Sequence, residues 1–261
     1  MGIDRSKRIT FEEKADLYTQ ARYPDALIEA IVSRSGIPPE GRILEVGCGP
    51  GNATVSFAQR GYHLLGIELG ERMAAIAAEN CHAFPKVQIV NMAFEAWEEE
   101  TAAFDLVIAA DALHWIPPEI SYPKAARVLK KGGWAAFFWR VPVDPQTDWS
   151  QEIDALYEQT TPAFTNPNTR FSAEWHEGII RNNFEASQCF GPVSSQQFMW
   201  TVPETTEQFL TGLRTFSMHH GIDEAAREKL YAKIGKVIDK YGGMVEKPET
   251  AVLYMAQVKE L

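Results

Sequence analysis

A glycine-rich turn near residue 50 is the feature of this sequence best suited to binding a ligand. The apolar run Arg42–Val46 leads directly into Gly47-Cys48-Gly49-Pro50-Gly51, and a helical pattern begins at Asn52. Glycines let the backbone approach a ligand closely where a strand of an open α/β sheet passes into a helix. Exposed amides at the start of that helix favour polar or anionic groups. The turn is therefore predicted to be a ligand-binding loop.

Two glutamates indicate which ligand the loop binds. Glu68 ends the next apolar run, where a carboxylate can accept hydrogen bonds from both hydroxyls of a ribose. A dinucleotide turn needs the spacing Gly-x-Gly-x-x-Gly, but this chain has Gly-x-Gly-x-Gly with Glu45 just before it. A carboxylate there would repel a pyrophosphate and suits a ligand that carries an ammonium and a sulfonium. The sequence therefore favours S-adenosyl-L-methionine over NAD.

The elements that must position these residues alternate as in a doubly wound α/β sheet. Short apolar runs indicate buried parallel strands, and the amphipathic stretches between them indicate covering helices. The predicted core strands are Arg42–Val46, His63–Glu68, Val87–Asn91, Asp105–Ala109 and Trp134–Trp139. The predicted helices are Asn52–Arg60, Glu71–Asn80, Glu119–Leu129 (followed by a stop and turn at Lys131-Gly132-Gly133) and Glu224–Tyr241. The strands Gln196–Thr201 and Thr250–Lys259 are expected to complete the sheet.

The chain is expected to form a single domain with four parts. Residues 1–40 are predicted to be a helical cover, residues 41–140 the cofactor-binding core and residues 195–261 the part that completes the sheet. Residues 141–194 are rich in aromatic residues and proline. They are expected to be a cap insertion over the carboxyl edge of the sheet, with some aromatic side chains facing the substrate.

Motifs spread over nearly the whole chain carry a family resemblance. They are Tyr18 with Arg22-Tyr23-Pro24, Leu44 to Gly51, Gly66-Ile67-Glu68, Phe104 to Val107, Ala112-Leu113-His114-Trp115, Gly242-Gly243 and Glu249 to Tyr254. With these motifs the sequence resembles the class I S-adenosylmethionine-dependent methyltransferases, in the small-molecule branch of trans-aconitate methyltransferase-like (methyltransferase type 11) proteins. The resemblance implies a Rossmann-like, seven-stranded, mostly parallel sheet whose last strand is antiparallel.

The resemblance also implies a set of cofactor-binding residues. Around the methionine part of the cofactor it places Glu45, Gly47, Cys48, Gly49, Gly51, Asp111 and Ala112. It places Glu68 at the ribose hydroxyls, and around the adenine Leu69, Met73, Ala93 and Phe94. Tyr18 and Arg22 lie on an N-terminal helix that covers the cofactor in this branch. The chain departs from the family at Met92, where an acidic residue commonly contacts the adenine amino group. Asp111 fits a cap of the following helix equally well.

The residues that would act on the acceptor follow the fourth and fifth strands. His114 is the candidate general base, because it lies at the carboxyl end of a strand and imidazole exchanges protons near neutral pH. The substrate-binding candidates are Trp115, Tyr23 on the N-terminal helix, and Arg140, a cation that could position a carboxylate. Transfer of a methyl group from a sulfonium mostly requires alignment, so neither an acid–base pair nor a metal is expected.

The amino-acid composition limits the classes of molecule and the cellular location expected for this protein. The net charge of −10, from 35 acidic and 25 basic residues, disfavours nucleic acid, and no apolar run approaches the roughly 20 residues of a membrane helix. The widely spaced Cys48, Cys81 and Cys189 indicate reduced thiols and a cytoplasmic location, without a metal signature. Adjacent His219 and His220 do not face one way on a helix, so no metal site is predicted there. The oligomeric state stays open.

The predicted function is methyl transfer from S-adenosylmethionine to a small-molecule acceptor, with a carboxylate or a hydroxyl as the candidate group. An NAD(P)-dependent oxidoreductase and a non-catalytic S-adenosylmethionine-binding relative are the alternatives. A lipid-modifying relative such as a cyclopropane synthase is a third, which the acidic composition and the lack of a basic amphipathic helix disfavour.

Overall fold

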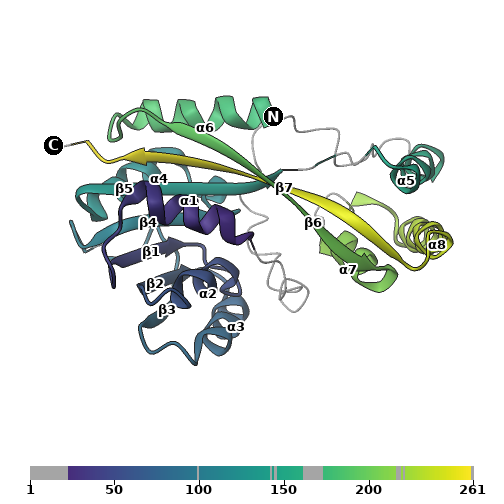
Figure 1. Ribbon diagram of the computed structural model, residues 1–261, viewed down its shortest axis with the longest axis horizontal. Helices are drawn as coiled ribbons and strands as arrows, with labels where there is room; N and C mark the ends of the chain where they lie inside the picture. The colour runs from purple at the N-terminus through teal and green to yellow at the C-terminus, as the bar shows by residue number, and fades with distance from the viewer. Residues whose placement is uncertain are drawn as a thin grey trace. The chain divides into compact units, whose positions relative to one another are not determined.

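The computed structural model describes residues 23–98, 100–141, 143, 146–160, 173–215, 219 and 221–259. The chain divides into two compact units (Figure 1). Unit 1 comprises Met1–Trp139, Glu177–Phe198 and Ala251–Leu261, and unit 2 comprises Arg140–His176 and Met199–Thr250. In the described part, no helix is long and apolar enough to cross a membrane.

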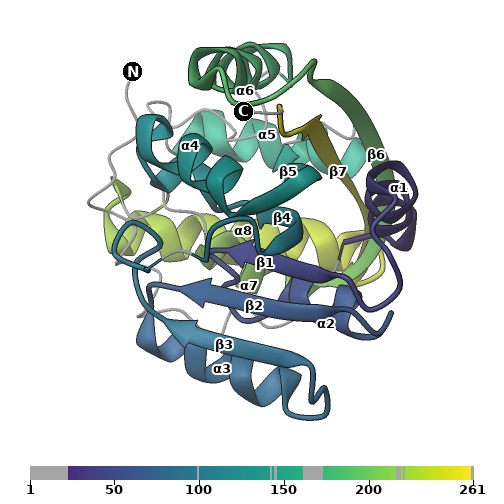
Figure 2. The same ribbon diagram turned by 90° about the vertical axis from the view of Figure 1, so that its left-hand side faces the viewer.

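A seven-stranded sheet in the order β3-β2-β1-β4-β5-β7-β6 organises the fold. Its strands are β1 (Arg42–Val46), β2 (His63–Glu68), β3 (Val87–Asn91), β4 (Phe104–Ala110), β5 (Leu129–Val141), β6 (Ser194–Thr205) and β7 (Met244–Gln257). Strands β1 to β5 pair in parallel and the last strand is antiparallel, as the family resemblance implied. Figure 2 shows β3, β2, β1 and β4 side by side.

Helices cover the sheet because their apolar residues recur at helical spacing. In α3 (Glu71–Cys81), Met73, Ala74, Ala77 and Cys81 are buried, which forms one apolar stripe. Helices α2 (Asn52–Ala58) and α3 pack on each other and on β2, and α1 (Asp25–Ser35) contacts α2. Further along the chain follow α4 (Pro118–Val128) and α6 (Ala173–Ser187).

The parallel register brings the carboxyl ends of the core strands to one edge of the sheet. Val46 of β1 pairs with Ile67, and Glu68 of β2 pairs with Asn91 at the end of β3. Ala110 at the end of β4 pairs with Phe138, next to the end of β5. The loops that follow these strands therefore converge, which is where open α/β sheets place their ligands.

Strand β5 begins earlier than the sequence predicted. Lys131-Gly132-Gly133, expected to be a helix stop and turn, lies inside β5. Gly132 has φ +78°, and the pairing of β4 with β5 shifts register between Phe104 and Leu106. A Cβ built on Gly133 would lie 2.9 Å from the Lys130 carbonyl oxygen, so only glycine fits this irregular pairing. The glycines thus shape an irregularity in the strand instead of ending the preceding element.

The expected cap, residues 141–194, is divided between the two units. Phe184 of α6 stacks on Phe137 of β5 at 5.3 Å and meets the Tyr122 ring edge-on, which joins this helix to unit 1. Ile153 and Tyr157 of α5 (Asp148–Thr160) instead pack in the apolar core of unit 2.

Unit 2 has its own apolar core. Helices α5, α7 (Thr206–Thr215) and α8 (Glu224–Lys240) supply most of its side chains. His219 is buried in unit 2 and lies 3.0 Å from the Tyr157 hydroxyl and 2.8 Å from the Tyr231 hydroxyl. These two contacts give His219 a structural role in unit 2, and His220 lies outside the described residues.

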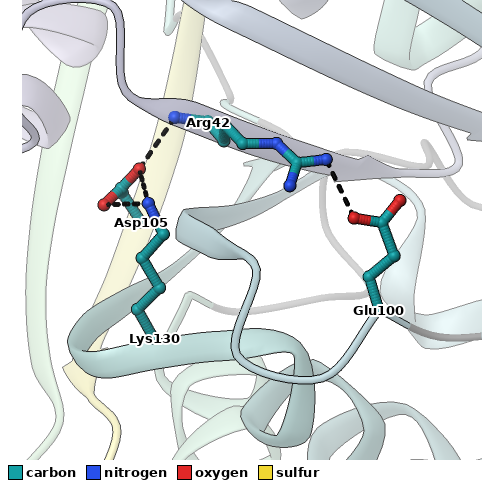
Figure 3. Close-up of polar contacts among 4 residues, drawn as sticks. All are labelled: Arg42, Glu100, Asp105 and Lys130. Atoms are coloured by element: carbon teal, nitrogen blue, oxygen red, sulfur yellow. Dashed lines mark hydrogen bonds and ion pairs between the residues drawn. The ribbon is translucent and has the colours of Figure 1, made fainter.

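The carboxylate of Asp105 links three core strands, β1, β4 and β5, near their amino ends (Figure 3). Asp105 of β4 accepts a hydrogen bond from the backbone N–H of Arg42 in β1 at 2.8 Å. It also accepts from the Lys130 ammonium of β5 at 2.8 and 3.0 Å. Arg42 in turn pairs with Glu100 at 3.0 Å. Asp105 thus stabilises the sheet at the edge opposite the converging loops.

Replacing Asp105 by alanine is expected to lower the free energy of unfolding by about 1–3 kcal/mol, because the Arg42 amide and the Lys130 ammonium lose their acceptor. Asp25→Ala, which removes an ion pair to Arg60 from a carboxylate that is 83% exposed, should cost no more than about 1 kcal/mol. Urea denaturation of both variants measures the difference. Equal, small losses would show that Asp105 does not hold the strands.

Candidate functional site

The glycine-rich loop owes its shape to three residues with positive φ. Gly47, Gly49 and Gly51 have φ values of +67°, +54° and +87°, which other L-residues rarely adopt. The Gly47 and Cys48 amides both donate to the Ile67 carbonyl of β2, at 2.8 and 3.1 Å. A Cβ built on Gly47 would lie 2.5 Å from the Ala112 Cβ, so the loop after β4 lies directly against the loop after β1.

Gly49 borders open space. A Cβ built on it would have no described atom within 4 Å, in contrast to Gly47. Its amide donates to Glu68 Oε2 at 2.8 Å, and the amide of Gly70 donates to Glu68 Oε1 at 2.8 Å. Each carboxylate oxygen of Glu68 therefore accepts one backbone hydrogen bond. Two fixed amides thus orient this carboxylate beside the open face of the loop.

Glu45 is a buried carboxyl group with one unsatisfied oxygen. The residue is 1% exposed, and its Oε2 accepts a hydrogen bond from the Thr54 hydroxyl at 2.6 Å. Its Oε1 is buried and has no hydrogen-bond partner among the described residues. Burial raises the pKa of Glu45 from its ordinary value of 4.5 to about 8; the Thr54 hydrogen bond opposes this shift and the charge of Glu68 adds to it. A buried, unpaired acceptor next to a second carboxylate favours a cationic partner.

This raised pKa predicts a pH-dependent stability. Between about pH 4.5 and 8, the folded protein holds the Glu45 proton and the unfolded chain does not, so the free energy of unfolding falls as pH rises. Glu45→Gln cannot ionise. Relative to this variant, the wild type is therefore expected to lose roughly 1 kcal/mol per pH unit across that range.

Urea denaturation from pH 5 to pH 9, without cofactor, measures this difference. Glu71→Gln, which changes an exposed carboxylate of the first turn of α3, is the matched control and should follow the wild type. Parallel curves for the wild type and Glu45→Gln would mean that Glu45 is ionised in the folded protein.

Beside Glu68, exposed apolar side chains adjoin a buried aromatic group. Leu69 and Met92 are 37% and 41% exposed, and the Met92 amide donates to the Glu68 carbonyl at 2.8 Å. Phe94 is buried and stacks on Trp97 with ring centres 6.2 Å apart. The buried lysine Lys124 lies 5.2 Å above the Phe94 ring. Met73 is also buried, on the inner face of α3, so Leu69 and Met92 offer the accessible apolar surface here.

Lys124 is a residue of this region that the sequence analysis did not identify. Its ammonium donates to the carbonyl oxygens of Glu95 and Trp97, at 3.3 and 2.5 Å. These bonds fix the loop after β3, on which Ala93 and Phe94 lie. A lysine on the inner face of an amphipathic helix was the only signal available in the sequence.

Asp111 and Tyr23, predicted for different roles, form one pair. The Tyr23 hydroxyl donates to Asp111 Oδ2 at 2.5 Å, and the Tyr23 ring meets Phe138 edge-on at 4.8 Å. Asp111 has φ +53°, an unfavourable conformation for a residue with a side chain. The following 3₁₀ turn, Leu113–Trp115, begins after Ala112 and has no side-chain cap, so Asp111 does not fill the capping role.

His114 and Trp115 are the second and third residues of this turn. The indole N–H of Trp139, near the end of β5, donates to His114 Nδ1 at 2.9 Å. The Trp115 ring packs on the His114 ring with centres 4.8 Å apart. The general-base role of His114 and the substrate-binding role of Trp115 stay predictions.

The remaining predicted residues lie elsewhere. Tyr18 and Arg22 lie outside the described residues. Arg140 belongs to unit 2, where its charge acts on the partly buried Glu204 carboxyl group. In the described part of the chain, no group of three metal-ligating side chains could hold a metal ion. The structure thus brings together Glu45, Glu68, the glycine loop and residues 111–115 within unit 1.

Known proteins share this core. Residues 43–133 match the sequence model of a family described as a methyltransferase domain. An uncharacterized methyltransferase-like protein of Schizosaccharomyces pombe is 24% identical over 87% of this chain and 85% of its own length. The ubiquinone biosynthesis O-methyltransferase of Acinetobacter baylyi is 30% identical over 44% of this chain and 50% of its own length.

A solved structure shares the fold. It is the phosphoethanolamine N-methyltransferase 2 of Haemonchus contortus, in complex with phosphomonomethylethanolamine and S-adenosylhomocysteine. The superposition covers 98% of this chain and 60% of that chain, with a TM-score of 0.57 and 17% sequence identity. Together with the sheet order and the glycine loop, the sequence matches identify a class I S-adenosylmethionine-dependent methyltransferase. Its cofactor is S-adenosylmethionine, and the oxidoreductase alternative is not favoured. The matches do not single out the trans-aconitate methyltransferase-like branch.

Proposed function

We propose that this enzyme transfers a methyl group from S-adenosylmethionine to an oxygen of a small-molecule acceptor, a carboxylate or a hydroxyl, as in the trans-aconitate methyltransferase-like branch. The observation that carries the proposal is the cradle formed by Glu45, Gly49 and Glu68. It joins an open backbone loop to an oriented carboxylate and to a buried oxygen that lacks a partner among the described residues.

The cradle residues fit the chemical groups of this cofactor. Glu68, a carboxylate oriented by two backbone amides, would accept hydrogen bonds from the ribose hydroxyls. Gly47, Cys48, Gly49 and Gly51 would line the methionine part. Glu45 Oε1 would receive positive charge from the ammonium or the sulfonium, which would favour the ionised carboxylate.

Residues around the cradle would complete the cofactor site. Leu69 and Ala93 would flank the adenine, and the exposed Met92 would add apolar surface where the family commonly has an acid. Met73 and Phe94, which are buried, would support this surface from the core. The Tyr23–Asp111 pair and Ala112 would close the methionine side, and Tyr18 and Arg22 would cover the cofactor.

The chemistry asks the protein mainly for alignment. The bound cofactor supplies a methyl group already activated by a positively charged sulfur. The chain's own residues would hold the acceptor oxygen in line with that methyl group and exclude water. Trp115 would bind the acceptor, whereas the role of Arg140, as a cation with affinity for carboxylates, stays a separate prediction.

A small acceptor is supported by the strongly acidic composition and by the names of two relatives. The net charge of −10 opposes a phosphate backbone. The names of two matched proteins refer to ubiquinone biosynthesis and to phosphoethanolamine. All three cysteines are unpaired thiols, which supports the expected cytoplasmic location.

Two assays test the proposal. Calorimetric titration should show S-adenosylhomocysteine binding in the micromolar range, about −8 kcal/mol, and no binding of NAD⁺. Formation of S-adenosylhomocysteine should then be measured with a panel of small carboxylic acids and alcohols, with tRNA and phospholipid vesicles as comparison substrates. Turnover with tRNA or vesicles alone would overturn the small-molecule assignment. Binding of NAD⁺ without S-adenosylhomocysteine would overturn the cofactor site.

A further inference from the structure

We propose that a pocket between α1 and the strands β6 and β7 binds a small carboxylate that carries a short apolar chain. The pocket has a volume of about 230 Å³, and its lining residues all belong to unit 1. The lining side chains that would recognise the ligand are Ser33 and Arg34 of α1, Ser194 and Gln196 of β6, and Leu253 and Met255 of β7.

The alternation of side chains along β6 explains which face of the sheet the pocket occupies. Ser195 accepts a hydrogen bond from Arg181 of α6 at 2.8 Å, so α6 lies on that face. Its neighbours Ser194 and Gln196 point to the opposite face, where α1 lies (Figure 2). The Ser194 hydroxyl donates to the Met255 carbonyl at 3.2 Å and links β6 to β7. Two joined strands therefore form the wall of the pocket that faces α1.

Arg34 supplies the positive charge of the pocket. It is the charged side chain among the described lining residues, and no described carboxylate pairs with it. Its guanidinium lies 5.9 Å from the centre of the Trp134 ring, a cation–π contact that positions the side chain without neutralising it. A carboxylate suits this group, because a guanidinium can donate two parallel hydrogen bonds to it. The single positive charge balances a carboxylate but leaves a phosphate dianion half neutralised.

The other lining side chains define the rest of the ligand. The Ser33 hydroxyl and the Gln196 amide make no side-chain hydrogen bond within the described part of the chain, so both are available as donors to a carboxylate. Leu253 and Met255 are 2% and 1% exposed and form an apolar floor. An apolar cavity of about 150 Å³ accommodates benzene, so this larger pocket takes a molecule of about eight to ten non-hydrogen atoms.

The pocket is separate from the cradle of Glu45, Gly49 and Glu68. The cradle lies at the ends of β1 and β2, whereas the pocket lies on β7 and β6, and β4 and β5 separate the two in the sheet. At about 4.8 Å per strand, the span from β1 to β7 is about 14 Å. The carboxylate is therefore a second ligand and not the methyl acceptor, and the proposal does not depend on the proposed function.

NMR titration of the full-length, nitrogen-15-labelled protein with hexanoate tests the site. Hexanoate has the charge and the size that the pocket requires. The backbone amide signals of residues 30–34, 194–196 and 253–255 should shift saturably, with a Kd on the order of 1 mM. Hexanol and hexylamine lack the negative charge, and inorganic phosphate lacks the apolar chain. All three should bind at least about 10-fold more weakly.

Three titration results would overturn the proposal. One is the absence of saturable shifts with hexanoate, and another is tighter binding of phosphate than of hexanoate. The third is a set of shifts confined to residues 45–51 and 111–115, which would place the carboxylate at the methyl-transfer site.

Two variants separate a built pocket from simple attraction to a positive charge. Arg34→Gln removes the guanidinium at an exposed position and should weaken hexanoate binding about 10- to 100-fold. Arg72→Gln, the same change on an exposed residue of α3, is the matched control and should bind like the wild type. Gln196→Trp keeps Arg34 but fills the pocket with an indole ring, so binding should again fall at least about 10-fold.

Both substituted positions in the pocket, Arg34 and Gln196, are exposed, so the variants should fold. Their urea midpoints should match that of the wild type. Hexanoate binding that survives Arg34→Gln would overturn the role of the guanidinium. Binding that survives Gln196→Trp would show that hexanoate does not enter the pocket.

Discussion

Glu68→Gln is expected to weaken the binding of S-adenosylhomocysteine about 100-fold, the loss of roughly one strong charge-assisted hydrogen bond. The carboxylate accepts the amides of Gly49 and Gly70, one on each oxygen, and would accept both ribose hydroxyls as well. Glutamine has one acceptor oxygen, so its NH₂ group would face an amide donor. The variant therefore loses contacts to the ribose and also the bond that orients the glycine loop.

Calorimetry at constant pH and salt measures this loss, and Glu71→Gln is the matched control. The control makes the same chemical change on an exposed residue three positions further along the chain. It should bind S-adenosylhomocysteine like the wild type. Unchanged affinity in a folded Glu68→Gln protein would mean that the ribose binds elsewhere.

Gly49→Ala is expected to reduce S-adenosylhomocysteine affinity about 10- to 100-fold while the protein stays folded, since crowding a tight contact costs about 1–3 kcal/mol. Gly49 has φ +54° and borders open space, so a methyl group there meets no described atom. The conformational strain of an alanine at this φ costs about 1–2 kcal/mol of stability. The added methyl would occupy the space in which the methionine part of the cofactor approaches the backbone.

Gly36→Ala is the control that separates strain from crowding. Gly36 follows the last residue of α1 and has φ +59°, and a Cβ built on it would also meet no described atom within 4 Å. Both variants should lose similar stability in urea, but only Gly49→Ala should lose affinity. Equal affinity in the two variants would show that the cofactor does not lie against Gly49.

Local patterns in the sequence were sufficient to predict most of the core. The bounds of β1, β2 and β3 agree with the expected strands, because a buried parallel strand is a short continuous run of apolar residues. The glycine loop and Glu68 were predicted because both lie at fixed distances from strand ends. The weaker predictions concerned boundaries that depend on neighbours. Thus β5 includes Lys131-Gly132-Gly133, since its pairing with β4 accommodates an irregularity.

The polar details of the site depended on contacts between residues far apart in the chain. Tyr23 and Asp111, whose hydroxyl and carboxylate meet, are 88 residues apart, and His114 and Trp139 are 25 apart. The division of residues 141–194 between two units likewise follows from the aromatic partners that each helix finds.

The sequence by itself determined the class of fold and was sufficient to predict a cofactor loop and a carboxylate for the ribose, because these predictions depend on hydrophobic periodicity and on residue spacing along one stretch of chain. Only the tertiary structure decided that Glu45 has an oxygen without a described partner and that the Nδ1 atom of His114 is occupied. Burial and hydrogen-bond pairing set the protonation and tautomer of a side chain, and both arise only when separate strands and loops pack together.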